Sequence, residues 1–248
     1  MPDSPSLADN IRTHLARVVA LRGQAQEFGL SEAVQAVKQL QARRFRGTYR
    51  DMLADPGRID AVRFFLEELY GNQDFSERDH QFSRIAGAIE RLFPLEVGQL
   101  ACDLAELHAL TESLDFSLAG HWQRERGKRL EAERYLAAWR LTGQPDARRH
   151  QLRVVRHLGD ELRHLTRRTS LRMALRMMRR PAEAAGLAAL QRFLERGFDA
   201  FSKLDDARAF LDCIEQRESA WLDCLDHADV DEATRRLTSA LEPHDVSP

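Results

Sequence analysis

The chain has 248 residues and a formal net charge of −2 at pH 7, with 43% hydrophobic and 31% charged residues. This length suits one large domain with a core of its own, and the composition excludes an intrinsically disordered chain. The longest hydrophobic runs are a few residues, as at Phe64 to Leu66, which excludes a transmembrane helix, and the first ten residues lack a secretory signal. We therefore expect a soluble, cytoplasmic protein.

Hydrophobic residues recur at spacings of three and four, the pattern of amphipathic helices, while alternating strand-like runs are nearly absent. Breaks rich in Pro or Gly separate the periodic segments. In chain order, the predicted helices cover residues 6–28, 31–46, 58–70, 76–93, 95–118, 128–142, 146–168, 170–179, 183–203, 206–227 and 230–241. The sequence thus predicts an all-α fold, a compact multi-helix bundle of about 9–11 helices with no sheet. We expect a single domain over residues 1–248, with flexible tails at residues 1–6 and 243–248.

The predicted helix 58–70 has hydrophobic residues on two sides. Phe65 and Leu66 fall on its main apolar stripe, whereas Phe64 points the other way among charged residues. Either both faces are buried or Phe64 is an exposed anchor for a partner. We expect burial on both faces, because large apolar patches are rarely left in water. Glu67 or Glu68 should then pair with an arginine from residues 121–180, since an unpaired buried carboxylate is costly.

The predicted helix 95–118 places His108 and Asp115 near the centre of its apolar stripe. Both side chains should be at least partly buried and therefore hydrogen-bonded. A satisfied core histidine is the default interpretation, but a buried histidine beside an acid can also act as a general base or hold a ligand. If the bundle contains a pocket, we expect it near His108 and Asp115, with Tyr70, Glu161 and His164 as further polar residues.

Three histidines repeat every seven residues along the predicted helix 146–168, at His150, His157 and His164. Adjacent members lie about 10 Å apart along a helix axis, too far to chelate one ion together. We expect them to hydrogen-bond to a neighbouring helix. The three cysteines have no metal-binding spacing either. The sequence therefore predicts no metal site and no cofactor.

Charge is sorted along the chain. Residues 121–180, the basic block, hold 17 basic and 6 acidic residues, net +11, between flanks of −5 (residues 1–120) and −8 (residues 181–248). Two interpretations follow. Either the acidic C-terminal helices pack on this block and neutralise it, or its arginines face an acidic protein or a small anionic ligand. The candidate arginines for such a surface are Arg124, Arg126, Arg149, Arg153, Arg156, Arg167 and Arg168.

Residues 171–178 within the basic block form an amphipathic stretch with three methionines. Such stretches lie on membranes or dock in the grooves of partners. They are more often internal helices, in which methionine fills irregular gaps.

The run RFFLEELYG at residues 63–71, followed by DFS at 74–76, resembles the signature of an uncharacterised bacterial family named for its FFLEELY stretch. Segments 44–49, 104–110, 178–186 and 193–198 are also similar to that family, so the resemblance covers roughly residues 40–200. It implies a bacterial, cytoplasmic protein with a domain of unknown function, and it brings no activity, substrate or catalytic residue.

We interpret the chain as a non-catalytic helical binding protein that presents an arginine-rich surface to an acidic protein or an anionic ligand. The first alternative is an enzyme or cofactor-binding bundle with a pocket near His108 and Asp115. The second is weak nucleic-acid binding through residues 124–180, although no nucleic-acid-binding module is visible and nucleic acid is not the expected partner. The sequence leaves the oligomeric state open.

Overall fold

The computed structural model describes residues 5–69, 74–125, 127 and 130–242. All regular structure in these ranges is helical, which confirms the prediction of an all-α fold without a sheet. The first half of the chain forms α1 (Leu7–Glu27), α2 (Ser31–Thr48), α3 (Arg50–Leu53), α4 (Ile59–Phe64), the π-helical turn η1 (Phe65–Leu69), α5 (Ser76–Leu92) and α6 (Leu95–Arg124). The second half forms α7 (Glu131–Thr142), α8 (Pro145–Thr166), α9 (Thr169–Met177), α10 (Arg179–Ala184), α11 (Ala188–Ser202), α12 (Ala207–His227) and α13 (Val230–Leu241).

The described residues thus form thirteen α-helices, two more than the upper end of the predicted range. The additional helices, α3 and α10, have only four and six residues, too few to show a periodic pattern in sequence. The predicted helix 58–70 is also divided, because its hydrogen bonding changes to the π type at Phe65.

The predicted N-terminal tail, residues 1–6, ends earlier than expected, because Ser6 belongs to the start of α1. Ser6 caps α1, its hydroxyl accepting a hydrogen bond from the backbone N–H of Asp9 at 3.2 Å. The other predicted tail residues at 1–4 and 243–248 lie outside the described residues, so this part of the prediction stands as it was.

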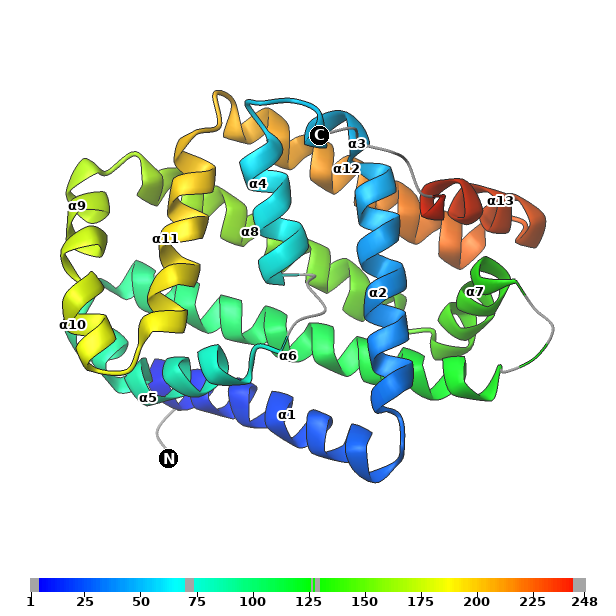
Figure 1. The fold of residues 1–248 in the computed structure, drawn as a ribbon, viewed down its shortest axis with the longest axis horizontal. Coiled ribbons are helices and arrows are strands. Elements are labelled where there is room, and N and C mark those ends of the chain that lie inside the picture. The colour runs from blue at the N-terminus through cyan, green and yellow to red at the C-terminus, as the bar shows by residue number, and fades with distance from the viewer. Residues whose placement is uncertain (1–4, 70–73, 126, 128–129, 243–248) are drawn as a thin grey trace.

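The longest helix, α6, runs along the length of the molecule with α1 beside it, and α8 and α12 lie alongside each other (Figure 1). In the same view α2, α4 and α11 cross these helices steeply, α9 and α10 form one end, and α7 and α13 form the other. Among the described residues no helix is both long and apolar enough to cross a membrane.

Two hydrophobic clusters form the core. The larger one joins α1, α4, η1, α5, α6, α8, α11 and α12. The smaller one, between α2, α6, α7, α12 and α13, contains all three tryptophans of the chain, Trp122, Trp139 and Trp221. The described cysteines are all free thiols.

The helix that carries the FFLEELY stretch is buried on both faces, as expected. The Phe64 ring is 7% exposed and lies 5.6 Å from the ring of Phe193 on α11. The expected partner of its carboxylates was wrong, however. Glu67 and Glu68 both pair with Arg196 of α11, which lies outside the basic block. The reason is topological, because α11 packs along α4 and supplies the nearest cation.

Candidate functional site

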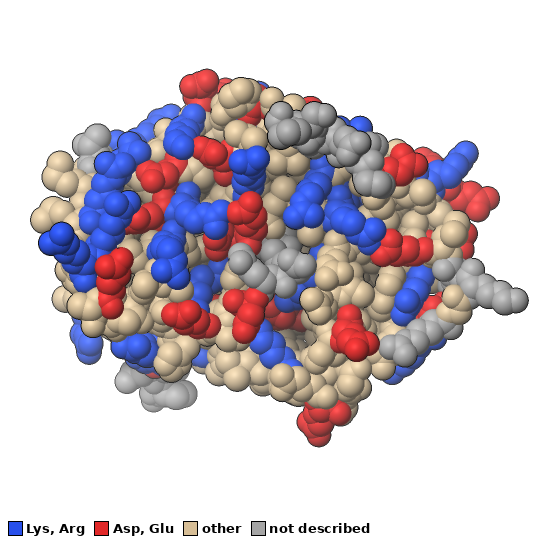
Figure 2. All heavy atoms as spheres, viewed as in Figure 1, with Lys and Arg blue, Asp and Glu red and all other residues tan. Residues whose placement is uncertain are grey.

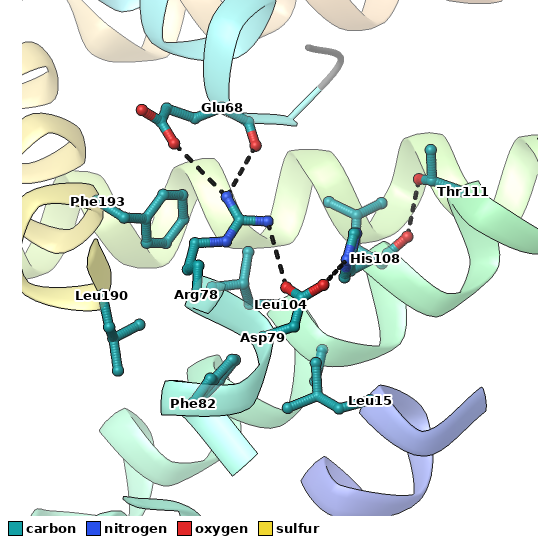
Figure 3. Close-up of a pocket in the computed structure, with 12 residues that line it drawn as sticks. Leu15, Glu68, Arg78, Asp79, Phe82, Leu104, His108, Thr111, Leu190 and Phe193 are labelled. Atoms are coloured by element: carbon teal, nitrogen blue, oxygen red, sulfur yellow. Dashed lines mark hydrogen bonds and ion pairs between the residues drawn. The ribbon is translucent and has the colours of Figure 1, made fainter. Parts of the chain in front are cut away.

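A small polar pocket lies where α1, η1, α5, α6 and α11 meet (Figure 3). The space open to the centre of a water molecule is about 20 Å³, which is room for about one water. Its polar lining is Glu68, Arg78, Asp79, His108 and Thr111. Its hydrophobic lining is Leu15, Phe82, Leu104, Ala105, Leu107, Leu190 and Phe193.

Asp79 is the centre of the polar group. His108 Nε2 lies 2.9 Å from Asp79 Oδ2, and Arg22 Nη1 of α1 lies 3.0 Å from the same oxygen. The Asp79 side chain is only 4% exposed. Burial alone would raise the pKa of this carboxyl, but the hydrogen bond and charge of His108, with Arg78 and Arg22, hold it below its usual value. Asp79 therefore carries a negative charge inside the bundle at neutral pH.

Arg78 connects η1 to α5. Its guanidinium donates from Nη1 to the backbone oxygen of Glu68 at 3.1 Å, and its Nη2 lies 3.7 Å from Asp79 Oδ1. The same group stacks on Phe75 and Phe193, at 4.1 and 4.7 Å from the ring centroids. Figure 3 shows the guanidinium between Glu68 and Asp79 with the Phe193 ring beside it. The cation is thus held by two acids and two rings, and it is not free to bind a ligand.

A further group of charges continues along α6, on the side that faces α1 and α2. Lys38 of α2 donates to Glu112 Oε1 at 2.6 Å, and Arg22 Nη2 lies 3.6 Å from the same oxygen. Asp115, 3% exposed, lies one turn farther along. The pocket is lined by His108 but not by Asp115, so the predicted pairing of these two residues in one pocket is wrong. They are seven residues apart, about 10 Å along the helix axis.

Asp115 has the most perturbed carboxyl of this group. Its pKa is raised to about 6, and burial is the main cause. The charge of Glu112 also raises it, while Lys38, Gln41 and Arg148 lower it. A carboxyl of this kind titrates near neutral pH, and its ionisation places a poorly solvated charge in the core.

The other residues predicted for the pocket lie elsewhere. His164 is exposed, with its Nε2 atom 3.1 Å from Arg163 Nη2. Glu161 is half-buried and near enough to Asp103 to raise the pKa of that carboxyl, and it does not line the pocket at His108. Tyr70 lies outside the described residues.

The histidine row on α8 contacts the neighbouring helix as expected at two of its three positions. His150 Nε2 lies 2.7 Å from Glu106 and His157 Nε2 lies 3.3 Å from Asp103, both on α6. Over the described part of the chain, no three His, Cys, Asp or Glu side chains are grouped so that they could hold a metal ion.

The sequence singled out His108 but missed its partners Asp79 and Arg22, and also Arg78, which contacts Asp79. One signal was present for Asp79, which lies three and seven residues before Phe82 and Ala86 and so shares their buried stripe on α5. The two arginines gave no such signal, because long basic side chains are ordinarily solvated.

The basic block divides into two parts. On α8, Arg149 Nη2 lies 3.4 Å from Asp223, and Arg156 Nη1 lies 2.5 Å from Asp212 and 3.3 Å from Glu215, all on α12. These contacts agree with the interpretation that the acidic C-terminal helices neutralise the basic block. Arg124 and Arg153 are exposed and have no ion pair with a described residue. Arg126 lies outside the described residues.

The second part of the block, residues 167–180, contains six arginines and no acid. Arg172 pairs with Asp199 at 3.0 Å and Arg179 with Glu195 at 2.6 Å. The remaining four are exposed, and none of their guanidinium groups bonds to a residue that the structure describes: Arg167, Arg168, Arg176 and Arg180. Figure 2 shows basic atoms concentrated toward the end of the molecule where α9 and α10 lie in Figure 1.

The same segment exposes three methionines to solvent. Met173, Met177 and Met178 are 66%, 72% and 49% exposed. None of the α9 side chains that the structure describes is fully buried. The interpretation of this stretch as an internal helix is therefore wrong, because α9 lies at the end of the bundle where nothing described covers its outer side. We define the α9–α10 surface as these three methionines with the four unpaired arginines.

Comparison with curated proteins and with solved structures gives no match in either case. The model of one protein family does match, over residues 20–232. This range includes the FFLEELY stretch, the α9–α10 surface and all lining residues of the polar pocket except Leu15. This confirms the expectation of an uncharacterised family. The chain therefore belongs to the family described as a domain of unknown function (DUF8198).

Proposed function

We propose that this protein is a non-catalytic binding protein that docks an acidic segment of a partner protein on its α9–α10 surface. One observation carries the proposal: three exposed methionines lie among four arginines that have no ion pair within the described residues. An acidic amphipathic helix would supply both the carboxylates and the apolar side chains that such a surface lacks.

The methionines favour a protein partner over a small anion. Unbranched, polarisable side chains adapt to differently shaped apolar groups, and they are common on surfaces that bind peptide helices. The four arginines are also spread from the turn before α9, which holds Arg167 and Arg168, to Arg176 on α9 and Arg180 on α10. This spread suits an extended acidic surface more than a single phosphate.

A membrane surface is the competing occupant. Interfacial helices usually insert Trp, Phe or Leu into the headgroup region. On α9 and α10 the well-exposed hydrophobic residues are methionines, and Leu171 and Leu175 are turned partly into the protein. The cysteines of the described chain are all free thiols, which is typical of proteins in a reducing compartment. We therefore propose that the protein binds its partner in the cytoplasm.

The test uses a fluorescent synthetic peptide of about 20 residues, designed as an amphipathic helix with Leu on one face and Glu on the other. We expect fluorescence anisotropy to show binding to the full chain. The double substitution Arg168→Glu/Arg176→Glu should weaken binding at least about tenfold, the equivalent of about 1.4 kcal/mol. Arg124→Glu/Arg153→Glu is the matched control, because it makes the same change in net charge away from α9 and α10.

Three results would contradict the proposal. The first is that the peptide does not bind. The second is an equal loss of affinity in the two double variants, which would show only a long-range effect of net charge. The third is that vesicles with about 30% phosphatidylserine, or a 20-base-pair DNA duplex, bind through Arg168 and Arg176 while the peptide does not. In that case a membrane or a nucleic acid is the partner.

A further inference from the structure

A second cavity lies between α4, η1, α6, α8 and α11, and hydrophobic residues and glycine alone line it. The space open to the centre of a water-sized sphere is about 100 Å³. The lining residues on α4, η1 and α11 include Phe64, Phe65, Phe193, Phe198 and Phe201. Both phenylalanines of the FFLEELY stretch thus face this cavity, and neither contributes to the proposed docking surface.

The walls of the cavity are held by close contacts. The Phe64 ring rests on Gly197, where an added Cβ atom would lie only 2.8 Å from the ring Cζ atom. The Phe65 ring packs at 6.0 Å from both Phe201 and Phe210. Because these rings are fixed by their neighbours, they cannot simply rotate inward and fill the space.

The cavity and the polar pocket share a wall made by Leu104 and Phe193. The charged groups of the polar pocket lie on the far side of that wall, where they pair with one another. No charged or hydrogen-bonding side chain lines the apolar cavity itself. A water molecule inside it would have few partners, so the cavity favours hydrocarbon over water.

The cavity is partly open to solvent on the side of α11 and α8. Leu194 at this opening is 41% exposed, and Leu158 and Leu162 are half-buried. A ligand can therefore enter here and keep a polar end in water. An apolar protein cavity of about 150 Å³ holds benzene. This cavity is smaller, at about 100 Å³, so its interior fits a hydrocarbon group of about the size of benzene or less.

We propose that the cavity binds a hydrocarbon group of up to about six carbon atoms, with the rest of the ligand and any polar end at the opening beside Leu194. An acyl chain and an aromatic ring share this chemistry, and the experiment separates them. The proposal is independent of the acidic-partner proposal, because it uses a different part of the molecule.

The test is isothermal titration of the full chain with octanoate and, separately, with p-xylene. We expect at least one of them to bind with a dissociation constant below about 1 mM. Octanoate alone would identify an acyl chain, and p-xylene alone would identify an aromatic ring. Acetate is the control for the carboxylate, since octanoate could also bind to exposed arginines, and it should give no heat of binding at the same concentration.

Leu158→Phe places additional carbon atoms in the cavity and should weaken binding at least tenfold. Leu141→Phe is the matched control, because Leu141 is 58% exposed and far from the cavity lining, and it should leave binding unchanged. If Leu158→Phe does not fold, as judged by circular dichroism, Leu162→Phe provides the same test. The proposal is overturned if neither ligand binds at 10 mM, or if the filled variants bind as well as the wild type.

Discussion

His108 and Asp79 form a buried pair that joins α6 to α5, with Nε2 of the histidine 2.9 Å from Oδ2 of the aspartate. Arg22 brings α1 to the same carboxylate oxygen at 3.0 Å. Three helices, α1, α5 and α6, therefore meet at one charge. Removing one partner of a buried ion pair leaves the other charge buried and uncompensated. This loss of stability is larger than the loss on replacing the whole pair by apolar residues.

Asp79→Asn should lower the free energy of unfolding by about 3–5 kcal/mol at pH 7, because the largely buried Arg78 and the partly buried Arg22 would lose this carboxylate. Urea denaturation measures the change. The exposed pair of Asp9 and Arg12, 3.3 Å apart, is the control, and Asp9→Asn should cost less than about 1 kcal/mol.

The pH dependence follows from the lowered pKa of Asp79. A carboxyl whose pKa is lower in the folded state stabilises the fold above its usual value of 3.8, and this contribution is lost as the pH falls further. The difference between wild type and Asp79→Asn should therefore be constant near neutral pH and shrink below about pH 4. A difference within 1 kcal/mol at pH 7 would show that the pair is not structural.

Asp115→Asn should have the opposite effect and stabilise the protein at pH 8, by about 1–3 kcal/mol. The folded pKa of about 6 exceeds the usual 3.8, so the folded state loses stability relative to the unfolded state as the pH rises through this interval. The neutral amide removes that penalty, and Lys38 keeps its bond to Glu112. Unfolding curves at pH 8 and pH 4.5 should show a gain that is much smaller at the lower pH. A loss of stability at pH 8 would contradict this account.

Gly47→Ala should destabilise the protein by about 1–3 kcal/mol, because an added Cβ atom would lie 2.0 Å from the backbone oxygen of Ala240 and push α13 away from α2. Gly120→Ala is the control, since Gly120 lies inside α6 with nothing within 4 Å of an added Cβ. That substitution should stabilise α6 by about 0.5–1 kcal/mol. Thermal unfolding of both variants measures the contrast, and equal effects would show that α2 and α13 do not pack so closely.

Most of the helices could be predicted because their apolar stripes are long. The predicted segment 206–227 and the observed α12 differ by a single residue, for example. The π turn at Phe65 could not be predicted, because the stripe continues through it and a change from one helical hydrogen bond to another leaves no periodic signal. The short helices α3 and α10 could not be predicted for a related reason, because four to six residues are too few to show a periodic pattern of hydrophobic residues.

The candidate sites were harder to predict, because they depend on which helices become neighbours. His108 was expected to be buried from its position on α6, but its partner Asp79 is 29 residues away along the chain. The basic block shows the same limit. Arg149 and Arg156 meet acids of α12, which runs antiparallel to α8, whereas Arg168 and Arg176 lie where the chain has turned away.

The salt dependence of peptide binding should differ between the variants. Raising NaCl from 50 to 500 mM shortens the Debye length from roughly 14 Å to roughly 4 Å and should weaken binding to the wild type by more than tenfold. The Arg168→Glu/Arg176→Glu variant should show a clearly smaller change, because the screened contacts are already lost. Anisotropy titrations at both salt concentrations measure this, and equal salt dependence in the two proteins would place the charge contacts elsewhere.

Methyl NMR of the methionines tests the proposed docking surface most directly. The chain has five methionines, of which Met173, Met177 and Met178 are exposed on this surface and Met52 is buried at 1% exposure. With ¹³C-methyl-labelled methionine, titration of the acidic peptide should shift the resonances of the three surface methionines and leave that of Met52 unchanged. Binding of the peptide without a shift at Met173, Met177 and Met178 would contradict the account.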